Sequence, residues 1–205
     1  MVVEQILVGQ DNFSYIAWCP VTRKAAILDA GMDIGPQTRS LNGKGLELLF
    51  IISTHHHFDH TMKVDSLREL TGARSLIGEQ DAAFLGGMVE GTLRDGQELT
   101  VGTIRLRVIE TPGHTPGSVC IIDENDRALF TGDTLFIGDC GRADLPGGDV
   151  GALFESIQRI KALPQDLTVY PGHDYGDRPY DTLGNQVRTN RTMLARDMKE
   201  FLGLP

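Results

Sequence analysis

The feature that most constrains this chain is a histidine-rich segment, HHHFDH at residues 55–60, that directly follows the apolar run Leu48–Ser53. The run has the length and composition of a strand buried on both faces. Imidazole and carboxylate groups at the end of such a strand are costly to bury unless they bind a partner. The segment therefore indicates a metal site, and a solvated His-rich loop is the alternative.

The spacing within the segment predicts how its side chains divide. Side chains two positions apart in an extended stretch point the same way, so His55 and His57 are expected to bind one ion together. Asp59 and His60 lie where the next helix is expected to begin, and they are expected to point toward a second ion. Imidazole and carboxylate ligands suit zinc, iron and manganese.

Three more segments place a histidine or an aspartate directly after an expected strand. They are Thr111–Ser118 with His114, Thr131–Thr134 with Asp133, and Tyr170–Tyr175 with His173. Taken singly, each is equally well interpreted as a turn residue, because Gly, Pro and Asp are common in turns. Their order along the chain is more informative than any one of them.

In that order the four segments resemble the motifs of the metallo-β-lactamase superfamily, and the resemblance runs from about Asn12 to Asn190. It implies an α/β fold, the αββα four-layer sandwich, with the metal site at the strand ends. It implies two divalent ions, the first bound by His55, His57 and His114, the second by Asp59, His60 and His173, with Asp133 between them. A metal-bound water can have a pKa of roughly 7, and Asp59 is the expected catalytic residue that orients the resulting hydroxide.

The loop Gly132–Asp144 resembles two branches of this superfamily, the glyoxalase II thioesterases and the persulfide dioxygenases. By that resemblance Arg142 and Tyr175 bind the thiol part of the substrate. The arginine fork suits a substrate carboxylate. Asp133, where true β-lactamases commonly have Cys or Ser, argues against antibiotic hydrolysis. The long basic C-terminal region of eukaryotic glyoxalase II is missing, and the candidates to replace it are Arg178, Arg188 and Arg191.

Three functions follow as hypotheses. The leading one is a metal-dependent hydrolase of a small-thiol thioester of the hydroxyacylglutathione type. The alternative is a persulfide dioxygenase that uses one iron and glutathione persulfide. The third is a metal-binding module without catalysis. Cys140 has no neighbouring histidine in sequence and is interpreted as a loop residue rather than a nucleophile.

Composition excludes several other classes. The formal net charge is −9 and the basic residues are scattered, so no nucleic-acid partner is expected. No apolar run is long enough to span a membrane. The N-terminus lacks a basic region followed by an apolar one, so a cytoplasmic location is expected. Three scattered cysteines argue against a disulfide framework. One domain over residues 1–205 is expected, and a homo-oligomer stays open.

The hydrophobic pattern predicts strands before helices, twice over. Expected strands are Glu4–Val8, Phe13–Trp18, Ala25–Asp29, Leu48–Ser53, Arg74–Ile77, Thr103–Glu110, Ser118–Ile122, Ala128–Phe130 and Leu167–Tyr170. Expected helices are a short one within Gly31–Gly45, then Thr61–Leu70, Glu79–Leu85, Asp149–Leu163 with Asp149 as N-cap, and a closing helix Leu183–Leu202.

Overall fold

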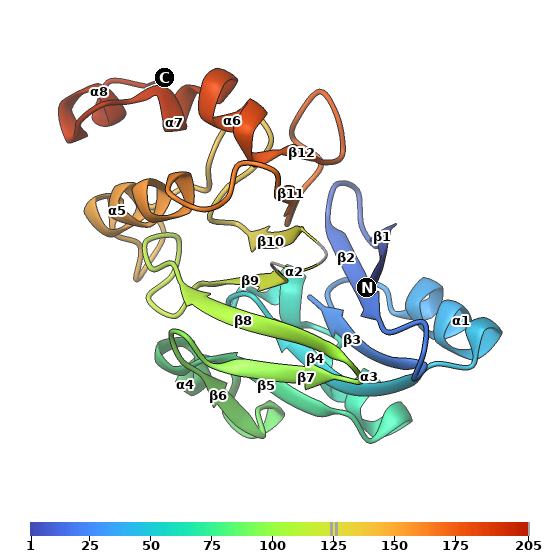
Figure 1. The fold of residues 1–205 in the computed structure, drawn as a ribbon. Helices are drawn as coiled ribbons and strands as arrows, with labels where there is room; N and C mark the ends of the chain where they lie inside the picture. The colour runs from blue at the N-terminus through green and yellow to red at the C-terminus, as the bar shows by residue number, and fades with distance from the viewer. Residues whose placement is uncertain (124, 126, 205) are drawn as a thin grey trace.

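The computed structural model describes residues 1–123, 125 and 127–204. Two six-stranded sheets pack face to face, and helices cover their outer sides (Figure 1). The first sheet is formed by β1 (Val2–Leu7), β2 (Phe13–Trp18), β3 (Lys24–Leu28), β4 (Glu47–Ser53), β5 (Arg74–Gly78) and β6 (Gly91–Leu93), in that order. The β1–β3 strands are antiparallel neighbours, and β3 to β6 pair in parallel.

The second sheet is formed by β7 (Glu98–Val101), β8 (Ile104–Glu110), β9 (Val119–Asp123), β10 (Ala128–Gly132), β11 (Thr168–Pro171) and β12 (Asp181–Thr182). Its spatial order again follows the chain, from β7 at one edge to β12 at the other. Only the β10–β11 pair is parallel. That crossover requires a connection of a dozen or more residues, which α5 (Val150–Lys161) supplies.

The remaining helices are short. They are α1 (Gly35–Lys44), α2 (Phe58–Thr61), α3 (Val64–Thr71), α4 (Ala82–Leu85), α6 (Leu183–Thr189), α7 (Arg191–Leu194) and α8 (Met198–Leu202), with 3-10 turns η1 (Glu79–Asp81) and η2 (Gly86–Met88). Asp149 caps α5 by accepting hydrogen bonds from the backbone N–H groups of Gly151 and Ala152, which confirms the predicted cap. In the described ranges no helix is long and apolar enough to cross a lipid bilayer.

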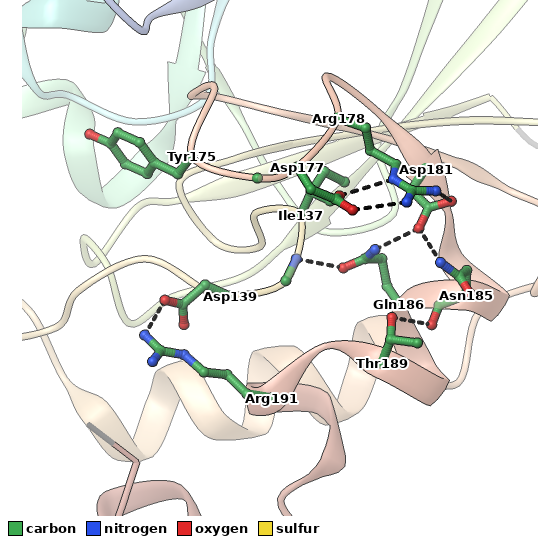
Figure 2. Close-up of a pocket in the computed structure, with 12 residues that line it drawn as sticks. Ile137, Asp139, Tyr175, Asp177, Arg178, Asp181, Asn185, Gln186, Thr189 and Arg191 are labelled. Carbon is green, nitrogen blue, oxygen red and sulfur yellow. Dashed lines mark hydrogen bonds and ion pairs between the residues drawn. The ribbon is translucent and has the colours of Figure 1, made fainter.

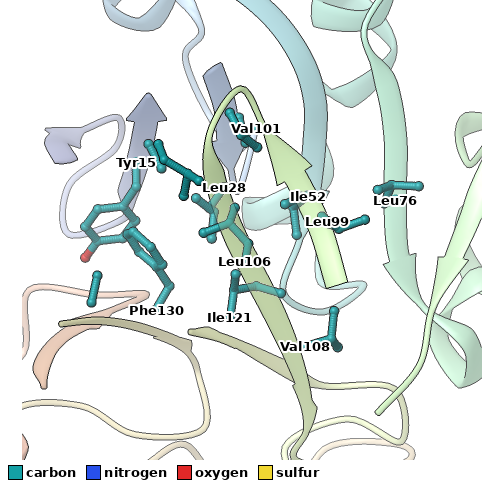
Figure 3. Packing of buried hydrophobic residues seen from close by; sticks show 14 of the residues in the cluster. Tyr15, Leu28, Ile52, Leu76, Leu99, Val101, Leu106, Val108, Ile121 and Phe130 are labelled. Atoms are coloured by element: carbon teal, nitrogen blue, oxygen red, sulfur yellow. The ribbon is translucent and has the colours of Figure 1, made fainter. Parts of the chain in front are cut away.

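The core lies in three layers that match the four-layer architecture. Between the sheets, Tyr15 and Ile52 pack with Leu106 and Phe130 among others (Figure 3). Outside each sheet a second and a third cluster join the strands to the helices. Adjacent residues of β4 go to different layers, with Ile51 in the outer cluster and Ile52 between the sheets. The prediction that this strand is buried on both faces is therefore confirmed.

Several predicted elements were wrong in extent. The closing helix Leu183–Leu202 is three helices, because Asn190 and Asp197 have extended backbone and cap new helices with their side chains. The helix Thr61–Leu70 is divided into α2 and α3, because Lys63 leaves the helical region at φ −109 and ψ 10. Strands β6 and β7 were missed; both are short, and β6 includes a glycine.

Candidate metal centre

The carboxyl ends of four strands deliver every residue of the predicted metal site. His55, His57, Asp59 and His60 follow β4 of the first sheet. The other three come from the second sheet: His114 follows β8, Asp133 follows β10 and His173 follows β11. The structure brings all seven together, as three overlapping groups whose ligand atoms lie within 4.8 Å of one another: His55, His57 and His114; His55, His60 and Asp133; Asp59, His60 and His173.

The carboxylate of Asp133 lies between the first and the last of these groups. Its Oδ1 is 3.4 Å from His60 Nε2. Its Oδ2 is 3.6 Å from His114 Nε2 and 3.3 Å from His173 Nε2. The backbone leaves little space here: a Cβ on Gly172 would lie 2.2 Å from Asp133 Oδ1. Only glycine fits at that position without displacing the carboxylate.

For four of the five histidines, a hydrogen bond on the far side of the ring fixes which nitrogen faces the centre. Thr54 Oγ1 donates to Asp29 Oδ2 at 2.9 Å, so it accepts from His55 Nδ1 at 3.1 Å. His55 Nε2 then carries a lone pair, and it is buried without a hydrogen-bond partner among the described residues. His114 Nδ1 donates to the carbonyl of Arg142 at 2.7 Å, which leaves its Nε2 facing His57 Nδ1 at 3.0 Å.

The second half of the centre repeats this arrangement. His60 Nδ1 lies 3.0 Å from Asp29 Oδ2, and His173 Nδ1 lies 3.3 Å from Asp11 Oδ1. Their Nε2 atoms face each other at 3.1 Å. Neutral rings held in this way turn lone pairs toward each other, which is unfavourable unless a cation or a proton lies between them. The donor set therefore fits a metal ion.

The electrostatics favour neutral rings at His55 and His57 and an ionised carboxylate at Asp133. Burial lowers the pKa of His55 well below its usual range, and burial with the neighbouring His114 lowers the pKa of His57 to about 4. Burial opposes ionisation of Asp133, but the histidines, His60 first, hold its pKa well below the usual range. Burial lowers the pKa of His60, yet the Asp133 and Asp29 carboxylates outweigh it and raise that pKa to about 10. The buried Asp133 and Asp29 carboxylates therefore make this position favourable for positive charge.

Asp59, like His57, is only partly buried, whereas the other five residues of the groups are buried. Asn12 Nδ2 donates to Asp59 Oδ2 at 2.9 Å, and this same oxygen is 3.6 Å from His60 Nε2 and 3.5 Å from His173 Nε2. The hydrogen bond fixes one carboxylate oxygen toward the histidines. Within the described ranges the other oxygen receives no hydrogen bond, so it can accept one from a ligand.

Four supporting residues were missed by the sequence analysis: Asp11, Asn12, Asp29 and Asp81. Asp29 ends β3 in the same way that the metal-site residues end their strands, and that position was the available signal. Asp81 is fully buried in η1 and joins two of the loops. Its carboxylate accepts from the backbone N–H of His56 at 2.9 Å, from Thr115 Oγ1 at 2.7 Å and from the N–H of Gly117 at 2.7 Å. His56, the one histidine of the segment outside the groups, also places Nδ1 2.9 Å from Asp81.

A cavity of about 350 Å³ opens beside the centre. It is lined by His114, Asp133, Phe136, Asp139, Cys140, Arg142 and Tyr175. Both predicted substrate residues are thus on its wall. Tyr175 stacks on His173 with ring centroids 4.8 Å apart. Arg142 is bound through its guanidinium to Asp144, at 2.6 and 2.7 Å, so a substrate carboxylate would compete with that pair.

Cys140 lines this cavity as well, but its thiol is not activated. Burial and the nearby Asp139 carboxylate raise the pKa of Cys140 to about 12. A thiolate is therefore disfavoured at neutral pH, in agreement with its interpretation as a loop residue.

A larger cavity of about 560 Å³ adjoins the first one and shares Asp139 and Tyr175 with it (Figure 2). Two of the three candidate C-terminal arginines line it. Arg178 is bound to Asp177 at 2.9 Å, and Arg191 pairs with Asp139. Arg188 is exposed on α6. Both lining arginines are already paired with carboxylates, so neither is a free anion site.

Comparisons with known proteins agree with this geometry. A hydroxyacylglutathione hydrolase of Rhodospirillum rubrum is 35% identical over 173 residues, 84% of this chain and 66% of that protein, so the chain spans slightly less than two thirds of its relative. ETHE1 from Myxococcus xanthus superposes with a TM-score of 0.86 at 29% identity, over 100% of this chain and 92% of that one. BLEG-1, a B3 metallo-beta-lactamase, also superposes with a TM-score of 0.86, at 30% identity over 95% of this chain and 100% of that one.

The family itself follows from the match over the whole site-bearing region. A model of the metallo-beta-lactamase superfamily matches residues 8–173, from the residue after β1 to the last histidine of the centre. The two stacked sheets with helices outside are the fold of its structural neighbours. The chain belongs to the metallo-beta-lactamase superfamily.

Proposed function

We propose that the protein is a metal-dependent hydrolase that cleaves a thioester of a small thiol, of the hydroxyacylglutathione type. The observation that carries the proposal is the set of converging lone pairs at the ends of four strands, beside a cavity lined by Arg142 and Tyr175. The similarity to a hydroxyacylglutathione hydrolase supports the choice of substrate.

The proposed ligands are those of the sequence analysis. One ion would be held by His55, His57 and His114, and a second by Asp59, His60 and His173. Asp133 would contribute to both sites. Zinc, iron and manganese all suit imidazole and carboxylate donors. Divalent ions at this position would acidify a bound water and polarise the thioester carbonyl.

The chain's own residues supply orientation and binding. The Asp59 oxygen that is not held by Asn12 can accept a hydrogen bond from the attacking water and so orient it. Arg142 and Tyr175 would hold the thiol part of the substrate on the cavity wall. Phe136 lies edge-on to Tyr175 with centroids 5.1 Å apart and lines the cavity beside it.

The test is turnover by protein loaded with each metal in turn. We expect hydrolysis of S-lactoylglutathione that persists under strict anaerobiosis, measured by release of free thiol. Metal-replete protein with no thioester turnover would refute the proposal. A chromogenic cephalosporin in parallel tests β-lactam hydrolysis, which BLEG-1 makes a necessary comparison.

A persulfide dioxygenase with a single iron is the second candidate. It is favoured by the sequence Cys140-Gly141-Arg142 and by the superposition on ETHE1, the neighbour that fits this function. Oxygen consumption with glutathione persulfide by the iron-loaded protein would support it. Activity of the zinc-loaded protein without oxygen would exclude it.

A further inference from the structure

One wall of the metal cavity is a tight turn at Phe136–Asp139. The Phe136 N–H donates to the carbonyl of Asp139 at 3.0 Å. The Phe136 ring is edge-on to His173, at 5.8 Å between centroids, as well as to Tyr175. Phe136 and Asp139 both line the cavity. The position of this turn therefore sets the shape of the space beside Tyr175.

The buried side chain of Asn190, between α6 and α7, makes two hydrogen bonds to this turn. Asn190, which is 0% exposed, donates from Nδ2 to the carbonyls of Phe136 at 3.1 Å and Asp139 at 3.0 Å. Its Oδ1 has a separate role, because it caps α7 by accepting from the N–H of Thr192 at 2.9 Å and from Thr192 Oγ1 at 2.7 Å. The two halves of one amide thus bind two different structures.

Neighbouring contacts support the same connection. Gln186 Oε1 accepts from the N–H of Gly138 at 2.8 Å, and Gln186 Nε2 donates to Asp181 Oδ2 at 2.8 Å (Figure 2). Arg191 pairs with the Asp139 carboxylate. Three residues of the α6–α7 segment therefore contact three positions of the turn, and Asn190 is the fully buried one among them.

The donor half of Asn190 is not needed for the α7 cap. A helix N-cap needs only an acceptor oxygen, and serine or aspartate provides one as well as asparagine does. The Nδ2 donors reach the turn, with Gln186 Oε1 as a third partner at 3.2 Å. We propose that Asn190 is a positioning residue that fixes the Phe136–Asp139 turn and thereby sets the affinity for the thiol part of the substrate. This inference rests on the proposed function.

The effect should appear in substrate binding rather than in metal content. The isolated bridge between Leu135 and Cys140 closes the loop on both sides of the turn. Asp133 lies before that bridge, and the Arg142 carbonyl that orients His114 lies after it. A change between Leu135 and Cys140 can therefore move Phe136 and Asp139 while Asp133 and the Arg142 carbonyl keep their positions at the metal centre.

The experiment compares Asn190→Ser and Asn190→Asp with the wild-type protein. Both variants keep an acceptor for the α7 cap and lose the amide donors, and the serine adds no charge. We expect KM for S-lactoylglutathione to rise about tenfold in each, with kcat and metal stoichiometry nearly unchanged. Amide hydrogen exchange of the peptide containing the turn should become faster, because its buried carbonyls lose their partner.

The control is Asp197→Ala, which removes the N-cap of α8 (Asp197 Oδ1 accepts from the Glu200 N–H at 2.9 Å) and has no contact with the turn. It should lower the Tm without changing KM. A wild-type KM in the Asn190 variants, or an equal KM change in the control, would overturn the inference. If the wild type lacks thioester turnover, the proposed function fails. The KM of the wild type and the variants for glutathione persulfide is then compared in the oxygen-consumption assay. If neither assay shows turnover, amide hydrogen exchange decides. Unchanged exchange of the turn in the Asn190 variants overturns the role of Asn190 as a positioning residue, and faster exchange with full metal content supports it.

Discussion

Replacing Asp81 by asparagine tests how the two histidine-bearing loops are joined. The carboxylate receives hydrogen bonds from His56, Thr115 and Gly117 in a fully buried position. Asparagine can keep its oxygen toward His56 and Thr115, but its NH2 group then faces the Gly117 N–H, which was 2.7 Å from an acceptor. One hydrogen bond to a charged group is lost and a buried donor is left unpaired, at a cost of about 2–3 kcal/mol.

For a chain of this size that loss lowers the Tm by roughly 4–12 °C. Chemical denaturation of the metal-free protein measures it without interference from metal binding. The matched control is Asp65→Asn, since the Asp65 side chain is 47% exposed and lies 3.5 Å from Arg68 on the same helix; it should change stability by less than about 0.5 kcal/mol. If Asp81→Asn were as stable as this control, the buried carboxylate would not be what joins the loops.

The same contact has a defined pH dependence. Burial tends to raise the pKa of Asp81, but the hydrogen bonds from His56, Thr115 and Gly117 hold it below its ordinary value of 3.8. A carboxyl whose pKa is lower in the folded state stabilises the protein fully above the unfolded pKa, and the stabilisation is lost as the pH falls through the folded pKa. The stability difference between wild type and Asp81→Asn should therefore be constant near pH 6–7 and shrink below about pH 4.

Three further substitutions test the centre itself. Asp29→Asn weakens the acceptor behind a ligand ring, and metal affinity measured by competition with a chelator should fall about 10–100-fold. Gly172→Ala places a Cβ 2.2 Å from Asp133 Oδ1 and should abolish metal retention. The control is Gly43→Ala, in a helix with open space around this position, which should retain metal and gain up to about 1 kcal/mol of stability. Equal metal retention by the two variants would contradict the packing argument. Arg142→Ala should raise KM for an anionic thioester and leave metal content unchanged, and a loss of metal would mean that its backbone has moved.

How far the sequence predicts this molecule depends on how local each signal is. The β4 run has the length and apolar composition of a buried strand, and the His-rich segment next to it has metal-ligand residue types at an informative spacing. Because both signals lie within a few residues, the strand and the metal site that follows it could be predicted. The three lone residues, His114, Asp133 and His173, became informative only through their order, which the family resemblance supplied.

The parts that were missed depend on contacts between distant segments. Asp81 and Asn12 are ordinary polar residues in sequence, and their roles exist only because the fold brings them to loops 25 and 47 residues away. The closing helix was predicted as one element, while the breaks at Asn190 and Asp197 are set by side-chain caps that compete with helix propagation.

The division of the ligands between two sheets has a consequence for the order of assembly. One sheet supplies four of the seven residues and the other supplies three, from segments that begin more than fifty positions further along the chain. Neither half can complete the site alone, so an ion can be captured at full affinity only after the faces have docked. Metal uptake would then mark the last stage of folding, and a bound ion would slow the first stage of unfolding, because the sheets could not separate while it bridged them.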